Sequence, residues 1–269
     1  MNKIGFIGSG NMAEALIKGI ISANLYAPEN VLVSDIRQDR LKYLAEEYGV
    51  QPASSNTELA SQVDVLVLSV KPQNMAAVLE EIQDSLNDSA VVISIAAGIT
   101  TERIAQFLGD VPIIRAMPNT PAMVDQGATA VVIRNTGPRQ FKAGLDVFMA
   151  VGKVEVLEDE SLIDAVTAVS GTGPAYFFLL MEELINVAID MGLPADIAKE
   201  LVFQTAKGAG LLAEMAYSRN ETPGQLRERV TSPGGTTAAA MKVLKDLDFN
   251  GIMTKALTAA RDRSRELSQ

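Results

Sequence analysis

Short apolar runs alternate with amphipathic segments along the first half of the chain. The apolar runs predict strands at residues 3–7, 30–34, 63–70, 90–95, 111–116, 127–134 and 152–157. Segments with helical spacing of apolar residues lie between them, for example at residues 38–48, 74–86 and 139–150. Runs such as Val65-Leu66-Val67-Leu68 are apolar without alternation, which is typical of parallel strands buried on both faces. The pattern therefore predicts an α/β fold with a doubly wound, mostly parallel sheet.

The pattern changes near residue 157, where strand signals stop and long helices begin. These helices are predicted at residues 160–168, 174–191, 195–218, 223–229, 236–246 and 249–267. The helix from Pro174 is apolar around most of its circumference, so it must be covered on several sides. This half of the chain gives limited cover by itself. We therefore expect a dinucleotide-binding domain at residues 1–157 and an all-α dimerisation domain at residues 158–269, assembled as a homodimer or a higher oligomer built from dimers.

A glycine-rich turn connects the first strand to the first helix. It reads Gly8-Ser9-Gly10-Asn11-Met12-Ala13, a GxGxxA form of the dinucleotide fingerprint. Gly8 permits the tight turn, Gly10 lets a pyrophosphate approach the main chain, and Ala13 allows the helix to pack closely on the strand. The alternative is a glycine-rich turn that binds no cofactor. The strand before the turn, the helix after it and the second strand about 20 residues further on favour a Rossmann-type domain.

The end of the second strand bears on the choice of cofactor. It reads Ser34-Asp35-Ile36-Arg37 and is expected to face the adenosine ribose. An acidic residue there favours an unphosphorylated ribose, whereas serine and arginine accommodate a 2′-phosphate. Ser34 and Arg37 favour NADP, with NADPH as the preferred reductant, and Asp35 leaves NADH possible.

Three further loops follow predicted strands, at the sheet edge where doubly wound folds bind ligands. They are Ser69-Val70-Lys71-Pro72, Ala96-Ala97-Gly98 and Met117-Pro118-Asn119-Thr120-Pro121. The small residues of the second loop would let a nicotinamide ribose lie against the main chain, and the prolines of the third would form a rigid wall. Proline, asparagine and glycine are also ordinary loop residues. Their position beside a dinucleotide fingerprint favours a shared active-site rim.

A second glycine-rich segment lies near the C-terminus. It reads Val230-Thr231-Ser232-Pro233-Gly234-Gly235-Thr236-Thr237 and leads into an alanine-rich helix. The free amides and the positive dipole end of a helix start favour a small anion such as a carboxylate. An ordinary capped helix start is the alternative. We interpret the amides of Gly235, Thr236 and Thr237, with Ser232, as the carboxylate site.

Composition excludes several classes of function. The chain has 23 basic and 33 acidic residues, a net charge of −10, so binding to nucleic-acid phosphates is not expected. With no cysteine and no histidine there is no disulfide, no Cys/His zinc site and no histidine general acid. We expect no metal, no membrane partner and, because a strand starts near the first residue with no signal peptide before it, a cytoplasmic protein.

Taken together, these segments resemble the pyrroline-5-carboxylate reductases along essentially the whole chain. Besides the fingerprint and the strand-end loops, the resemblance rests on Leu162-Ile163-Asp164-Ala165-Val166-Thr167 and Ser170-Gly171-Thr172-Gly173-Pro174-Ala175-Tyr176. The Ser232–Thr237 loop is its most specific part. The resemblance implies reduction of the cyclic imine 1-pyrroline-5-carboxylate to L-proline with NAD(P)H. It also implies a helical domain that interlocks with a second subunit, and substrate held between the nicotinamide and the Pro-Gly-Gly loop.

The motifs and the resemblance together give the candidate site residues. The candidate cofactor-binding residues are Phe6, Ile7, Gly8, Ser9, Gly10, Asn11, Met12, Ser34, Arg37, Asn56, Ser69, Val70, Lys71, Pro72, Ala96 and Ala97. The candidate substrate-binding residues are Met117, Asn119, Ser232, Gly235, Thr236 and Thr237. Thr237 is the candidate catalytic residue, with its hydroxyl on the ring nitrogen of the substrate. Capping of the helix is the alternative role for that hydroxyl.

Two other functions fit the same architecture. A β-hydroxyacid dehydrogenase or an imine reductase would place a catalytic lysine or aspartate on the first long interdomain helix, but no lysine occurs from Val154 through Ala198. A non-enzymatic NAD(P)-sensing protein would keep the fold without a second ligand site. The missing lysine argues against the first, and the carboxylate site near the C-terminus argues against the second.

Overall fold

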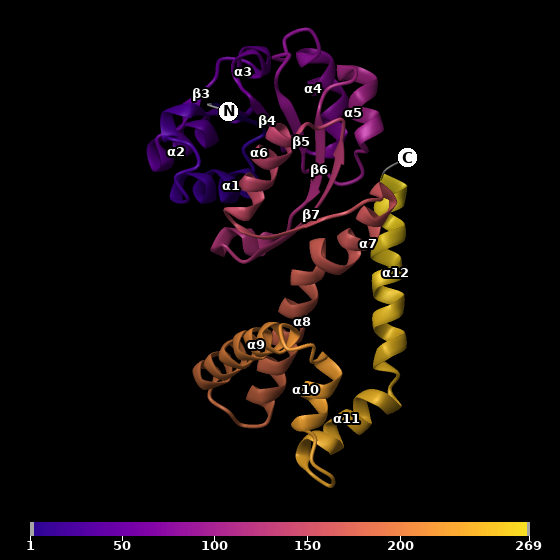
Figure 1. The fold of residues 1–269 in the computed structure, drawn as a ribbon. Coiled ribbons are helices and arrows are strands. Elements are labelled where there is room, and N and C mark those ends of the chain that lie inside the picture. Colours follow the sequence, from indigo (N-terminus) through magenta and orange to yellow (C-terminus); the bar gives the residue numbers. More distant parts are fainter. Residues whose placement is uncertain (1–2, 268–269) are drawn as a thin grey trace. The chain divides into compact units, whose positions relative to one another are not determined.

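An eight-stranded sheet forms the centre of the first compact unit of the chain (Figure 1). The computed structural model describes residues 3–267. The strands are β1 (Ile4–Ile7), β2 (Val31–Ser34), β3 (Gln51–Pro52), β4 (Val65–Leu68), β5 (Val91–Ser94), β6 (Ile113–Met117), β7 (Gly127–Arg134) and β8 (Gly152–Val156). Their order is β3-β2-β1-β4-β5-β6-β7-β8, and β6 and β7 are the antiparallel pair. The predicted doubly wound, mostly parallel sheet is confirmed.

Helices cover both faces of the sheet, because successive strand residues point to opposite sides. Val65 and Val67 contact one buried cluster, and Leu66 and Leu68 contact the other. The first cluster is covered by α1 (Asn11–Ser22), α2 (Gln38–Tyr48) and α6 (Pro138–Met149). The second is covered by α3 (Asn56–Gln62), α4 (Met75–Ile82) and α5 (Thr101–Leu108). Short 3-10 turns η1 (Pro28–Asn30), η2 (Pro72–Asn74) and η3 (Thr120–Val124) lie in the connections.

Three short elements are additions to the predicted ones: β3, α3 and α5. A side chain at the N-cap position begins each of the two helices, α3 and α5. The Ser55 side chain accepts a hydrogen bond from the Glu58 N–H at α3, and the Thr100 side chain accepts one from the Arg103 N–H at α5. The Ser-x-x-Glu spacing at residues 55–58 is the sequence signal that would have located α3. These helices are too short to give a strong periodic pattern.

The predicted helix at residues 160–168 is divided into three pieces. They are a 3-10 turn η4 (Glu160–Leu162), α7 (Ile163–Val166) and a π-helical turn η5 (Thr167–Gly171). All three belong to the first unit, which contains the chain up to Pro174 and again from Ala259. The predicted domain boundary at residues 157 and 158 therefore differs from the division between compact units. The reason is packing, because Ile163 is buried in the cluster that includes Met117 of β6.

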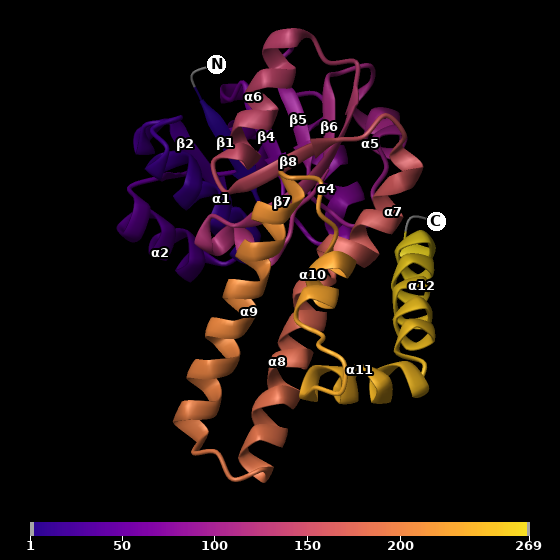
Figure 2. The ribbon, with the colours of Figure 1, turned by 60° about the horizontal axis from the view of Figure 1, so that its bottom comes forward.

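The second unit, Ala175–Thr258, is entirely helical (Figure 2). Its elements are most of α8 (Gly173–Asp190), α9 (Ala195–Tyr217), α10 (Pro223–Arg229), α11 (Thr236–Asp246) and the first half of α12 (Phe249–Leu267). Large apolar side chains are exposed on them, with Phe177 64% and Phe178 60% exposed in the single chain. One helical stretch, Glu160–Asp190, is long and apolar enough to cross a membrane by length and composition, and 17% of its most apolar window is buried. An exposed apolar surface of this extent marks an interface.

Candidate active site

The glycine fingerprint turns tightly at the end of β1. Gly8 has φ +91°, and a Cβ atom there would lie 2.8 Å from the main-chain carbon of Ser69. Only glycine fits that position without strain. Gly10 differs, because a Cβ atom there would meet nothing within 4 Å. Gly10 is also the N-cap of α1 and makes no side-chain cap bond, so the helix start is open to an anion. This geometry fits a dinucleotide pyrophosphate.

Polar side chains from α2 and from the end of β2 hold the fingerprint loop at Ser9. The Ser9 N–H donates to Asp35 Oδ2 at 2.8 Å, and Arg40 Nε donates to the Ser9 carbonyl at 2.7 Å. Arg40 also forms an ion pair with Glu14. Burial raises the pKa of the Glu14 carboxyl, but hydrogen bonds from Arg40 and Tyr48 outweigh it and leave the pKa below its ordinary value. Sequence reasoning missed Arg40 and Glu14, since only the pairing of β1 with β2 brings them together.

At the end of β2 the carboxylate of Asp35 is already occupied by protein donors. It accepts hydrogen bonds from Arg37 Nε at 3.1 Å and from Arg37 Nη2 at 3.1 Å, besides the Ser9 N–H. These bonds outweigh the effect of burial, which raises the pKa, and leave the Asp35 pKa below its ordinary value. Ser34 Oγ donates to Asn56 Oδ1 at 2.7 Å. The structure thus brings Ser34 and Asn56 together, with the exposed guanidinium of Arg37 attached to Asp35.

The loops after β4 and β5 follow the fingerprint along the same sheet edge. Ser69 Oγ donates to the Ile7 carbonyl at 3.1 Å and also bonds the Gly8 carbonyl, so it fastens the turn. Val70 and Pro72 are half-buried, and Lys71 is exposed. Ala96 is buried and Ala97 half-buried. These residues form one rim at the carboxyl ends of parallel strands.

Four of the predicted cofactor residues lie on β1 or at the start of α1. Phe6 and Ile7 have side chains buried in the two core clusters, on opposite faces of the sheet. They can therefore offer a ligand only their main chain. Asn11, the first residue of α1, is exposed, and Met12 packs half-buried against the core.

The loop after β6 carries two of the predicted substrate-binding residues, Met117 and Asn119. Met117 is the last residue of β6 and is buried with Ile163. Asn119 is 8% exposed; its Oδ1 accepts from the Ala128 N–H at 2.8 Å, and its Nδ2 donates to the Ser170 carbonyl at 3.1 Å. The Asn119 amide thus braces the loop against β7 and the π-helical turn. Each of these groups keeps one further hydrogen-bonding position, so substrate binding by Asn119 stays a prediction.

A buried arginine lies on β6 beneath this loop. Arg115 is 3% exposed, and its Nη1 donates to Glu160 Oε1 at 2.8 Å. Glu160 also accepts from the Thr101 N–H at 2.9 Å and from the Thr101 hydroxyl at 2.6 Å. Arg115 Nε and Nη2 are buried without a hydrogen-bond partner among residues 3–267. The positive charge of the buried guanidinium is therefore stabilised mainly by its ion pair with Glu160. Burial raises the pKa of Glu160, but these bonds outweigh it and leave the pKa below its ordinary value.

This pair predicts a pH-dependent stability. A carboxyl whose pKa is lower in the folded state stabilises the fold above its unfolded pKa, and that contribution is lost as pH falls through the folded pKa. We expect Glu160→Gln to destabilise the protein by about 2 kcal/mol at pH 7, below the range for fully buried pairs because Glu160 is partly exposed. The difference should shrink below about pH 4.3, the ordinary glutamate value. Thermal unfolding of both proteins across pH 3–7 measures it.

A matched control is Glu102→Gln. Glu102 pairs with Arg134 at 2.5 Å, but both side chains are exposed, so we expect a change within about 0.5 kcal/mol at every pH. A Glu160→Gln effect as small as that, or one independent of pH, would contradict the role assigned to the buried pair.

The Ser232–Thr237 loop forms a tight turn in the second unit. The Gly235 N–H donates to the Ser232 carbonyl at 3.0 Å, and Gly234 has φ +74° after Pro233. This is a proline-glycine type II turn. In this structure the Gly235 amide closes the turn, and its predicted use for the substrate carboxylate stays a prediction. The first bond within α11 runs from the Ala239 N–H to the Gly235 carbonyl at 3.2 Å, so the open amides are those of Thr236, Thr237 and Ala238.

Thr237 is the second residue of α11, and Gly235 is the N-cap. The N-cap glycine has no side chain with which to cap the helix, and Thr237 lies inside the helix and not at the usual capping position. The Ser232 hydroxyl lies within the turn, 2.6 Å from the position of a Cβ on Gly235. Ser232 and Thr236 are exposed, and Thr237 is half-buried. The residues predicted to bind the carboxylate therefore lie in one loop of the second unit, and Met117 and Asn119 lie in the first; the site itself stays a prediction.

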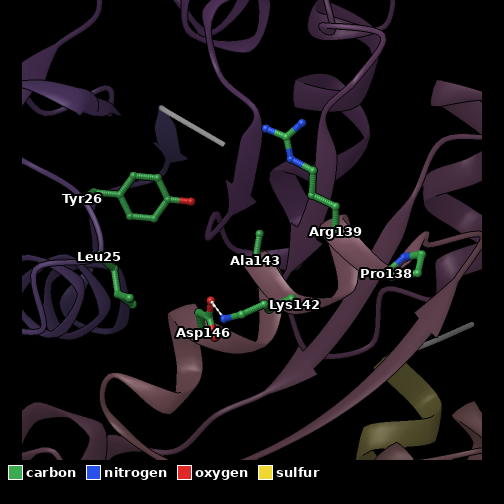
Figure 3. Close-up of a pocket in the computed structure, with 7 residues that line it drawn as sticks. All are labelled: Leu25, Tyr26, Pro138, Arg139, Lys142, Ala143 and Asp146. Atoms are coloured by element: carbon green, nitrogen blue, oxygen red, sulfur yellow. Dashed lines mark hydrogen bonds and ion pairs between the residues drawn. The ribbon is translucent and has the colours of Figure 1, made fainter.

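A hollow of about 460 Å³ lies elsewhere, between the residues before η1 and helix α6 (Figure 3). Tyr26, Arg139, Lys142 and Asp146 are among its lining residues, and Lys142 Nζ pairs with Asp146 at 2.6 Å. Burial, with the charges of Asp64 and Asp146, raises the pKa of Tyr26 to about 12. None of the predicted site residues is among the lining residues of the hollow. Residues 3–267 hold no group of three acidic side chains placed to bind a metal.

The fold and the fingerprint define a dinucleotide-dependent oxidoreductase with a helical second domain. A family model described as pyrroline-5-carboxylate reductase dimerisation matches residues 160–267, and one described as NADP oxidoreductase, coenzyme F420-dependent, matches residues 3–98. The pyrroline-5-carboxylate reductase of Pseudomonas aeruginosa is 42% identical over 99% of this chain and 97% of its own length. The chain belongs to the pyrroline-5-carboxylate reductase family.

Solved structures agree with this assignment. The chain is similar to a pyrroline-5-carboxylate reductase from Coxiella burnetii, with a TM-score of 0.90 and 41% identity over 100% of this chain and 99% of that one. It is also similar to the Plasmodium falciparum pyrroline carboxylate reductase with NADP bound, with a TM-score of 0.89 and 32% identity over 100% and 98% of the two chains.

Proposed function

We propose that this chain reduces 1-pyrroline-5-carboxylate to L-proline with NADPH. The proposal rests on two helix starts in this chain that are open to an anionic ligand. One is the open helix start at Gly10, and the other is the open start of α11 after the Pro-Gly-Gly turn. A protein that only senses NAD(P) has no need of the second site, which is predicted to bind the substrate carboxylate.

The chemistry suits a chain without histidine or cysteine. When bound, the reduced nicotinamide supplies a hydride to the imine carbon, and the C=N electron pair then passes to nitrogen. A substrate that arrives as an iminium already carries its proton, so the protein needs no group that titrates near neutrality. The remaining task of the protein is orientation. The amides of Thr236, Thr237 and Ala238 would hold the carboxylate, with Ser232 beside them, and the Thr237 hydroxyl would bond the ring nitrogen.

The end of β2 supports NADPH over NADH. Discrimination for NADH uses a free acidic side chain that binds the ribose 2′-hydroxyl. Here Asp35 is engaged by Ser9 and Arg37, and its lowered pKa keeps it as a bonded carboxylate. The exposed Arg37 guanidinium offers a positive charge to a 2′-phosphate. The Ser34 hydroxyl donates to Asn56 Oδ1 and the Asn56 amide donates to Glu81 Oε2, so these two side chains would have to exchange those bonds to bind it.

One assay tests the reaction. NADPH consumption and proline formation are measured with 1-pyrroline-5-carboxylate, and equal amounts of both support the proposal. Oxidation of 3-hydroxy acids with NADP, without imine turnover, would favour a β-hydroxyacid dehydrogenase. Reduction of imines that lack a carboxylate at equal efficiency would favour a general imine reductase. NADPH binding with no turnover of any of these substrates would favour a non-enzymatic NAD(P)-sensing protein.

The exposed apolar face of α8 predicts an obligate homodimer. The cytoplasmic location expected from the sequence is a separate proposal. Burial of Phe177, Phe178 and Leu180 against a partner contributes about 1.5–3 kcal/mol each. We expect Phe178→Asp to raise the dimer dissociation constant at least about tenfold, measured by sedimentation velocity across a dilution series. Lys42→Ala, a change on an exposed residue of α2, is the control and should leave the constant unchanged. A parent protein that is a stable, active monomer would contradict the prediction.

A further inference from the structure

The last turn of α12 lies against the loop between β5 and α5. Gly98 of that loop has φ +78°, and a Cβ atom there would lie 2.5 Å from the carbonyl oxygen of Leu267 and 2.7 Å from its carbonyl carbon. Gly98 is buried, so nothing larger than glycine fits between the loop and the helix end. The sequence interpretation of residues 96–98 was close approach of a ribose. At Gly98 itself, the close approach is that of the protein's own C-terminal helix.

The same turn is anchored on α7 by a buried serine. Ser264 is 3% exposed, and its Oγ donates to Asp164 Oδ1 at 2.7 Å. Arg265 Nε lies 3.7 Å from Asp164 Oδ2, a longer and more exposed contact. Both views of the ribbon show α7 beside the C-terminal end of α12 (Figures 1 and 2). The hydrogen bond joins residues that are 100 positions apart, so it fixes where the last turn of α12 can lie relative to α7.

The β5–α5 loop is held at its other end by the start of η4. The Glu160 carboxylate accepts from the Thr101 N–H and hydroxyl, at 2.9 and 2.6 Å, and is paired with Arg115. The loop from Ala96 to Thr101 is therefore fixed at Gly98 by Leu267 and at Thr101 by Glu160. Asp164 and Ser264 lie on the same two chain segments as these contacts, one preceding α8 and one ending α12.

We propose that the last turn of α12 is a positioning element for the cofactor, acting through the Ser264–Asp164 bond and the Leu267–Gly98 contact. It keeps Ala96 and Ala97 in the arrangement that receives the nicotinamide half of NADPH. This role rests on the proposed function, in which Ala96 and Ala97 contact the cofactor. A loop released from the turn occupies the binding arrangement for only part of the time, and the apparent dissociation constant for NADPH rises by the reciprocal of that fraction.

Three variants isolate the bond. Ser264→Ala and Asp164→Ala remove it, whereas Asp164→Asn keeps an oxygen that accepts from Ser264 and removes only the charge. We expect the KM for NADPH and the NADPH dissociation constant, measured by fluorescence without imine, to rise about fivefold or more in the two alanine variants. Asp164→Asn should stay within about twofold of the parent, because the longer Arg265 contact is exposed and weak. The KM for the imine should change less than about twofold in all three.

The control pair lies on the same helix turn but faces solvent. Arg263 Nη1 and Glu266 Oε2 form an exposed ion pair at 2.6 Å, and Arg263→Ala should leave every constant unchanged. A folded Ser264→Ala protein whose KM for NADPH equals that of the parent would overturn the proposal. A fall in melting temperature and kcat with both KM values unchanged would also overturn it, because that result describes a purely structural contact.

Ala97→Val separates this proposal from the assignment of the loop to the cofactor. If Ala97→Val raises the NADPH dissociation constant and Ser264→Ala does not, the loop binds cofactor but the last turn does not position it. If neither changes the constant while NADPH-dependent turnover of the imine is normal, Ala96 and Ala97 are not cofactor contacts and the positioning role is refuted with them.

Discussion

Gly10→Val is expected to weaken NADPH binding by about a hundredfold or more, a loss of about 2.7 kcal/mol, while the sheet stays folded. The backbone at Gly10, with φ −71° and ψ −176°, is one that valine adopts readily. A side chain there meets no protein atom within 4 Å, so the apoprotein has room for it. That room is where the cofactor pyrophosphate must approach the helix start, and a valine would occupy it.

The measurements are an NADPH fluorescence titration and a melting temperature without cofactor. Gly10→Ala, with a smaller side chain, should give an intermediate affinity. Gly8→Ala is the contrasting variant, because Gly8 has φ +91° and lies against the Ser69 main chain. It should lower the melting temperature of the apoprotein, whereas Gly10→Val should not. If the folded Gly10→Val protein binds NADPH as tightly as the parent, the assignment of the fingerprint turn as the pyrophosphate site is wrong.

Thr237→Ala is expected to lower kcat/KM about tenfold or more and to leave NADPH affinity and the dimer unchanged. Tenfold corresponds to about 1.4 kcal/mol, the loss of one positioning hydrogen bond in the transition state. The structure sharpens the expectation for stability. Gly235 is the N-cap, and Thr237 is already inside α11, where alanine is the better helix former. The melting temperature should therefore hold or rise slightly.

Thr237→Ser is the matched control, since it keeps the hydroxyl and loses only the methyl group. It should retain most of the kcat/KM of the parent. The capping alternative predicts the reverse for Thr237→Ala, namely near-normal turnover with a lower melting temperature. That outcome, measured in a folded dimer that binds NADPH normally, would rule out a catalytic role for the hydroxyl.

Much of the fold was readable from local pattern. The unbroken apolar run at Val65-Leu66-Val67-Leu68 predicted a strand buried on both faces, and its side chains do enter both core clusters. The bounds of α9 and α11 agree with the predicted ones to within a residue, because long periodic segments carry a strong signal. The seven-residue α3 and the two-residue β3 carry almost none. The helix at residues 160–168 was predicted as regular, but its π-helical turn arises where Asn119 binds the Ser170 carbonyl.

The sequence by itself determined the class of fold, the fingerprint turn and the Pro-Gly-Gly turn, because each depends on residues a few positions apart. The tertiary structure alone decided which polar groups remain open to a ligand. The sequence left open whether Asp35 is free to bind a ribose and predicted Asn119 as a substrate contact. In the structure Ser9 and Arg37 donate to the first, and Ala128 and Ser170 bond the second. Such partners are set by strand order and by packing between distant segments. A hydrogen-bonding group is available to substrate only when no nearer protein group has taken it.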